Sequence, residues 1–208
     1  MRIHSREIPP QNSSAPVKRL ILIPVIHNLA DLGSLAESVR AHYLERFGPS
    51  VWQQRERAVE ALWNDIRRAI EAFHFNFRQV RIYQDGLPVC GKEEQIVQEL
   101  AGAGSLNHQL VLELVGKGAV LVGTEDPQLL IREYQLQRSQ MDAPGANDQA
   151  ASSSSGEAAD VLAARDRFIT QRIAATLQDG ETGLLFLGAA HHIDALRLEG
   201  IDVVTLNR

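Results

Sequence analysis

The sequence predicts a single α/β domain with a mostly parallel sheet of about five strands and helices on both faces. Short apolar runs alternate with helix-like segments along 208 residues, the order expected of strands joined by helical crossovers. The apolar runs, of which Gly183–Leu187 is the clearest, show no alternation of apolar and polar residues. Strands of that kind are buried on both faces, as in parallel sheets covered by helices. A hydrophobic content of 44% suits one domain with a proper core.

The first elements follow a short lead-in. Residues 1–16 contain three prolines and are expected to be extended or flexible. A strand is expected at Arg19–Ile26, and because Pro24 lacks an amide hydrogen we expect pairing to end near it on one side. Ser34 begins a Ser-x-x-Glu capping box, which predicts a helix start. Gly48 and the proline after it predict that helix's end.

The rest of the chain continues the alternation. A longer helix is expected from about Ser50 to Phe73, where apolar residues recur on one face. The remaining expected elements are, in order, a strand at Gln79–Gln84, helices at Lys92–Leu100 and Ser105–Val115, a strand at Gly118–Gly123, a helix from Asp126-Pro127 to about Arg138, a helix at Ala158–Gln178, a strand at Gly183–Leu187, a helical turn at Ile193–Leu198 and a strand at Gly200–Leu206. Residues 17–208 would form the domain.

The segment Met141–Glu157 interrupts this pattern. It consists of small and polar residues with a Pro-Gly pair, so it buries too little apolar surface to order itself. We expect a flexible insert within the domain at about 141–157.

Composition narrows the classes of partner and location. A formal net charge of −5 and the lack of a basic cluster argue against nucleic acid as the main partner. The single cysteine, Cys90, excludes an internal disulfide and fits a reducing, cytoplasmic setting. No apolar run reaches the roughly 20 residues of a spanning helix, and the N-terminus lacks an apolar signal core. We therefore expect neither membrane association nor export.

Residues with ligating or acid–base chemistry follow the expected strands. The carboxyl ends of parallel strands share one edge of the sheet, where ligands of open α/β sheets bind. The residues expected there are His27 and Asp31 after the first strand, Asp85 after the second, Glu125 after the third, and His191 with His192 after the fourth. Imidazoles and carboxylates together are a ligand set for a first-row divalent metal, whose bound water becomes acidic enough to attack a substrate.

Structural roles are open for the same residues. Asp31 is an alternative helix cap, Asp85 has a turn partner in Gly86, and Glu125 is placed to favour a helix dipole. Consecutive side chains diverge, so at most one of His191 and His192 is expected to face the edge. The sequence contains no phosphate-binding loop, dinucleotide-binding fingerprint, serine nucleophile elbow or His-Glu-x-x-His pair.

The order of these features resembles the TraB, TIKI and ChaN-like superfamily, which is also grouped with erythromycin-esterase-like proteins. The family pattern has a histidine after the first strand, an early acidic residue, an Arg-Asn or similar pair on a late helix and a Gly-x-x-His at the next strand's end. Ile-Pro-Val-Ile-His27, Asp85, Arg165-Asp166 and Gly188-Ala-Ala-His191 stand at these places, with Pro24 where the family has glycine. The match is closest over the last quarter of the chain.

The residues and the resemblance together give two hypotheses. The first is a metal-assisted hydrolase with a small-molecule or peptide substrate, in which His27, Asp31 and His191 are metal ligands. Asp85 and Glu125 would complete the shell or act as base, and Arg165 would hold an anionic group or orient Asp85. The second is a non-catalytic module that binds a small molecule or a protein at the same edge.

Overall fold

The computed structural model confirms the α/β fold with one five-stranded parallel sheet. It describes residues 17–26, 28–31, 36–142, 148–192 and 198–206. The strands are β1 Lys18–Val25, β2 Val80–Gln84, β3 Val120–Val122, β4 Thr182–Gly188 and β5 Ile201–Thr205. Their order is β3-β2-β4-β1-β5 and every pair is parallel. The strands β1 and β4, which precede the predicted histidines, are therefore neighbours.

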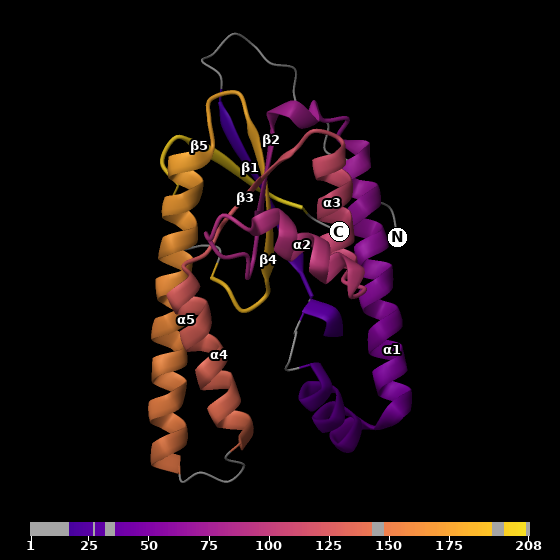
Figure 1. The fold of residues 1–208 in the computed structure, drawn as a ribbon, viewed down its shortest axis with the longest axis vertical. Helices are drawn as coiled ribbons and strands as arrows, with labels where there is room; N and C mark the ends of the chain where they lie inside the picture. The colour runs from indigo at the N-terminus through magenta and orange to yellow at the C-terminus, as the bar shows by residue number, and fades with distance from the viewer. Residues whose placement is uncertain (1–16, 27, 32–35, 143–147, 193–197, 207–208) are drawn as a thin grey trace.

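The helices are α1 Ala36–Ala72, α2 Glu93–Gly102, α3 Leu106–Gly116, α4 Pro127–Asp142 and α5 Asp148–Thr176, with a 3-10 turn η2 at Phe77–Gln79. Figure 1 shows α1 and α3 on one side of the sheet and α5 on the other. One core cluster joins α1, α2 and α3 to the sheet, and a second joins α5 to the opposite face. Helices on both faces bury the central strands, as the apolar runs predict.

Two sequence signals around the first strand and first helix have clear structural counterparts. β1 pairs with β4 as far as Val25, whereas its pairing with β5 ends at Leu22, two residues before Pro24. The expected loss of pairing on one side at the proline is thus observed. Gly48 has φ 79° and interrupts α1, so the predicted break between two helices is present. A left-handed conformation of this kind favours glycine.

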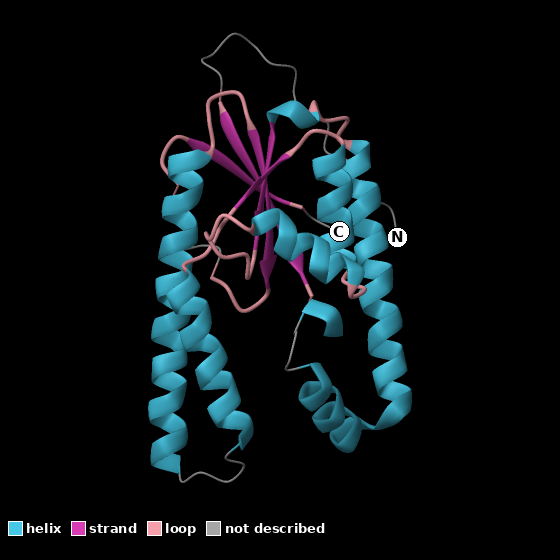
Figure 2. Ribbon diagram, in the orientation of Figure 1, coloured by secondary structure: helices cyan, strands magenta, loops and turns pink. Residues whose placement is uncertain are grey.

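The expected insert at 141–157 is wrong in part. α4 continues to Asp142, and α5 begins at Asp148, ten residues before the predicted helix start at Ala158. α4 and α5 lie side by side as a hairpin that extends beyond the sheet (Figure 2), and Arg132 pairs with Glu157 across it. This helix–helix contact and the helix propensity of alanine outweigh the weak helix propensity of the serine run. Residues 143–147 lie outside the described residues.

Other predictions also fall outside the described part of the chain. These concern the lead-in 1–16, the cap at Ser34, and most of the helical turn at Ile193–Leu198. No helix among the described residues is long and apolar enough to cross a membrane.

Candidate metal centre

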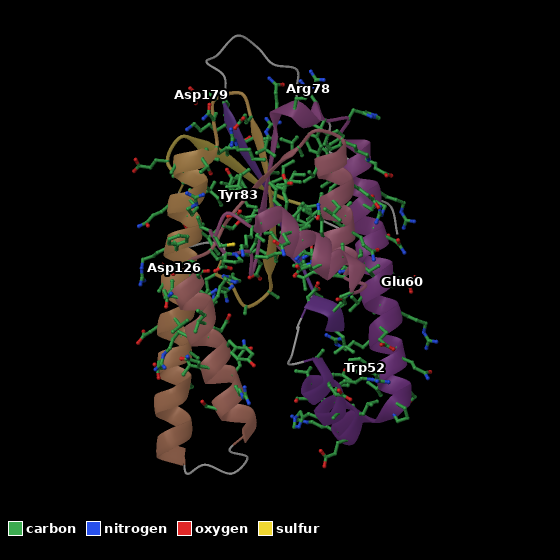
Figure 3. The ribbon with its side chains drawn as sticks, viewed as in Figure 1. Trp52, Glu60, Arg78, Tyr83, Asp126 and Asp179 are labelled. Carbon is green, nitrogen blue, oxygen red and sulfur yellow. The ribbon has the colours of Figure 1, made fainter. Side chains whose placement is uncertain are left out.

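Three of the predicted residues meet at the carboxyl edge of the sheet. Asp85 follows β2, Glu125 follows β3 and His191 follows β4, and one ligand atom from each lies within 4.8 Å of the others. Figure 3 labels Tyr83, which lies two residues before Asp85 in the chain, and Asp126, which follows Glu125. The topology explains the meeting, because β3, β2 and β4 are adjacent and parallel.

Backbone contacts fix Asp85 at the junction of β2 and β4. Its amide donates to the carbonyl of Phe186 at 2.9 Å, and its Oδ2 accepts the amide of Gly188 at 2.9 Å. Its Oδ1 faces the rest of the cluster. The following residue, Gly86, has φ 76° and donates its amide to Glu125 Oε1 at 2.9 Å. A tight glycine turn thus joins the ends of three strands.

Arg165 of α5 lies at the centre of the carboxylates. It donates from Nε to Glu125 Oε2 at 2.8 Å and from Nη2 to Glu125 Oε1 at 2.5 Å. The same Nη2 donates to Asp85 Oδ1, and Nη1 donates to Glu133 Oε2 of α4, each at 2.7 Å. Burial alone would lower the pKa of the guanidinium, but the carboxylates that it contacts raise the pKa above its ordinary value. The guanidinium is therefore charged at neutral pH.

Carboxylates occupy the hydrogen-bonding nitrogens of Arg165. All three of its nitrogens are engaged by carboxylates and its side chain is only 5% exposed. The alternative in which it orients Asp85 is supported by this geometry, and the alternative in which it holds an anionic substrate group is not. Glu125 is completely buried and bound to the same guanidinium. Burial raises the pKa of Glu125, and Arg165 opposes that rise.

His191 is oriented by Asp166, the residue after Arg165. Its Nδ1 lies 2.5 Å from Asp166 Oδ1, and the amide of His192 lies 3.3 Å from Asp166 Oδ2. Its Nε2 lies 3.4 Å from Asp85 Oδ1. Of the adjacent histidines, His191 is therefore the one that faces the cluster, and His192 is exposed. The sequence marks Asp166 only as part of the Arg165-Asp166 pair; the place of this pair between Val161 and Ile169, on the apolar face of the helix, is the signal that could have identified it.

The last two predicted metal ligands have different outcomes. His27 lies outside the described residues. Among the described residues, Asp31 accepts the amide of Asn28 at 2.8 Å and the hydroxyl of Ser105, so these contacts hold it against the start of α3. His108 Nδ1 lies 3.3 Å from the same carboxylate. We call Asp31, Ser105 and His108 the Ser105 clamp, and Asp85, Glu125, Glu133, Arg165, Asp166 and His191 the Arg165 cluster.

The Ser105 clamp joins the loop after β1 to the start of α3. Ser105 caps α3 by accepting the amide of His108 at 3.1 Å, as its sequence position predicts, and Asn28 donates to the carbonyl of Gly104 at 3.2 Å. Asp31 thus contacts the start of α3, whereas its alternative role as a cap of the first helix involves residues 32–35, which lie outside the described residues.

In comparisons with known proteins, no protein-family model, curated protein or solved structure matches the chain.

Proposed function

We propose that the Arg165 cluster binds one divalent metal ion and that the protein is a metal-assisted hydrolase. The observation that carries the proposal is the approach of His191 Nε2 to Asp85 Oδ1 at 3.4 Å while Asp166 holds Nδ1. A neutral imidazole that donates from Nδ1 presents a lone pair at Nε2, which would face an anionic oxygen. A cation between these two atoms, either a metal ion or a proton, removes that conflict.

The separation fits a shared metal ligand pair. Two ligands with bonds of about 2.1 Å to a tetrahedral ion lie roughly 3.4 Å apart. The Asp166 carboxylate behind His191 is the partner that metal-bound histidines usually have, because it fixes the tautomer and raises the basicity of the ligating nitrogen. Asp85 and His191 are therefore the proposed ligands. Glu125, whose oxygens are bound to Arg165, supports Asp85 from behind.

The charge balance also favours a divalent cation. Three carboxylates of the cluster, from Asp85, Glu125 and Glu133, contact one guanidinium, and the carboxylate of Asp166 contacts His191. Excess buried negative charge is costly unless a cation compensates it. A bound metal ion would supply this compensation and, as a Lewis acid, would lower the pKa of a coordinated water to about 7. His27, which follows the neighbouring strand, stays a predicted third ligand.

Metal analysis of the protein purified without chelator tests the first half of the proposal. Wild type should retain or take up about one divalent ion, and metal at 100 times Kd should stabilise it by about 2.7 kcal/mol. His191→Ala and Asp85→Asn should abolish this stabilisation. His192→Ala is the matched control and should retain it. His27→Ala should also abolish it. A chelator-insensitive wild type with no metal-dependent shift contradicts the proposal.

Chromogenic esters, amides and phosphate esters test the second half. Metal-loaded wild type should hydrolyse at least one class, and either chelator or His191→Ala should remove that activity. If the protein binds the metal but hydrolyses none of these substrates, the hydrolase half of the proposal is wrong and the metal-binding half stands.

The burial of the cluster favours one alternative function. Arg165, Asp85 and His191 are each under a tenth exposed at their side chains. A largely buried ion network of this kind can serve a non-catalytic module that binds a small molecule or protein at the same edge. Under this second proposal a proton rather than a metal ion lies between His191 and Asp85, and chelator has no effect.

A further inference from the structure

Two buried amide side chains lie on the other face of the same sheet edge. Gln84 is the last residue of β2, and Asn107 is the second residue of α3. Both are 0% exposed. Neither oxygen has a hydrogen-bond partner among the described residues, nor does Asn107 Nδ2, while Gln84 Nε2 makes one long contact of 3.4 Å with the carbonyl of Asp85.

Sequence spacing puts the two amides on the same core. Val80 and Ile82 of β2 belong to the cluster shared with α1 and α3, so Gln84, two residues further, lies on that face. Leu110, Val111 and Leu114 belong to it as well and lie three, four and seven residues after Asn107.

Both amides also lie at the carboxyl end of that core. The start of α3 is held by the loop that leaves the carboxyl end of β1, through Asn28 and Asp31. The opposite end of α3 adjoins the start of β3. α3 therefore runs against the strands, and its Asn107 is at the edge where Gln84 ends β2 and Asp85 begins the Arg165 cluster.

We propose that Gln84 and Asn107 bind one small neutral group that both donates and accepts hydrogen bonds. Leaving buried amide atoms unpaired costs about as much as losing their hydrogen bonds, so native proteins rarely leave them without a partner. The unpaired atoms are the side-chain oxygens of Gln84 and Asn107, which accept, and the side-chain nitrogen of Asn107, which donates. Three such partners are the number that an internal water needs. A primary or secondary carboxamide has the same pattern. A neutral group fits best, because the core residues around the amides are apolar and would leave a charge uncompensated.

This inference concerns the face opposite the proposed metal ligands, and it stands whether or not a metal binds. The test uses Asn107→Leu and Gln84→Met, which keep the approximate volumes and remove the amides. Asn64→Leu, at an exposed position of α1, is the matched control. Urea unfolding of each variant is measured alone and with acetamide as the carboxamide probe, whose binding is also followed by ligand-detected NMR.

Three results are distinguishable. If water is the bound group, Asn107→Leu should shift the unfolding equilibrium toward the unfolded state by roughly five- to hundredfold, and acetamide should do nothing. If a carboxamide is the group, Asn107→Leu should raise stability without probe, and acetamide should stabilise only wild type and Asn64→Leu.

An Asn107→Leu protein that is more stable than wild type, with no acetamide binding to either, overturns the proposal. The double variant tests sharing of one group: if Gln84→Met and Asn107→Leu shift stability additively, the two amides do not hold the same group, which also overturns it.

Discussion

The Arg165 cluster and the Ser105 clamp each place a buried histidine beside a carboxylate at the same sheet edge, yet they differ in how their charges are balanced. In the Ser105 clamp, Asp31 receives the hydroxyl of Ser105 and the amide of Asn28, and two of the three residues are held by the start of α3. In the Arg165 cluster, three carboxylates share one guanidinium and a fourth, from Asp166, contacts His191. The first arrangement fixes a loop, and the second is the place where we propose a bound cation.

Of the substitutions that test this comparison, removal of the guanidinium should change the free energy of unfolding most. Arg165→Met leaves Asp85 and Glu125 buried without their cation, which should cost about 3 to 5 kcal/mol of unfolding free energy. Urea denaturation checks this value. The double variant Arg165→Met with Glu125→Gln should recover part of the loss, because it removes one uncompensated charge. A loss below about 1 kcal/mol for the single variant would show that the network is not energetically coupled.

The partner behind His191 should matter next. Asp166→Asn keeps the shape of the side chain and removes its charge, so we expect metal affinity to fall by about 10- to 100-fold. Metal titration followed by calorimetry checks this result. Asp160→Asn, an exposed position on the same helix, is the matched control and should leave the affinity unchanged. Equal affinities of Asp166→Asn and wild type would separate His191 from the proposed metal.

The Ser105 clamp should show a smaller, purely structural effect. Ser105→Ala removes the cap of α3 and the hydroxyl donor to Asp31, which should cost about 1 to 2 kcal/mol. Thermal or urea unfolding measures the cost. The metal affinity of this variant should equal that of wild type, since the clamp contributes no proposed ligand. A variant that loses metal binding while staying folded would place the two clusters in one site.

The smallest effect concerns pH in the chelator-treated protein. Burial alone would lower the pKa of His191, but Asp85 and Asp166 outweigh it and raise the pKa. A raised folded-state pKa contributes stability that is complete below the unfolded value of about 6.5 and is lost as pH rises through the folded-state pKa. The stability difference between wild type and His191→Gln should therefore shrink as pH rises across that window.

His192→Gln controls for loss of an imidazole and should show no such pH-dependent difference. If the stability difference between wild type and His191→Gln instead grows with pH, a proton does not lie between His191 and Asp85.

The sequence by itself determined the elements of this fold because its signals are local. Apolar runs specified the strands, Ser105 and the Gly48-Pro49 pair specified a helix cap and a helix break, and Pro24 marked the end of one pairing. The same local reasoning failed at Asp148–Glu157, where the serine run is polar enough to suggest a loop. There the neighbouring helix α4 contributes contacts that composition does not contain.

Tertiary structure alone decided which of the strand-end residues meet. Asp31 and His191 follow adjacent strands, so position along the chain gave them equal claims to one metal site, but the start of α3 binds Asp31 instead. Asp85, Glu125 and His191 meet because β4 is inserted between β1 and β2, an order that no local pattern encodes. Local sequence patterns specify which residues follow a strand, whereas strand order and helix packing specify which of those residues contact one another.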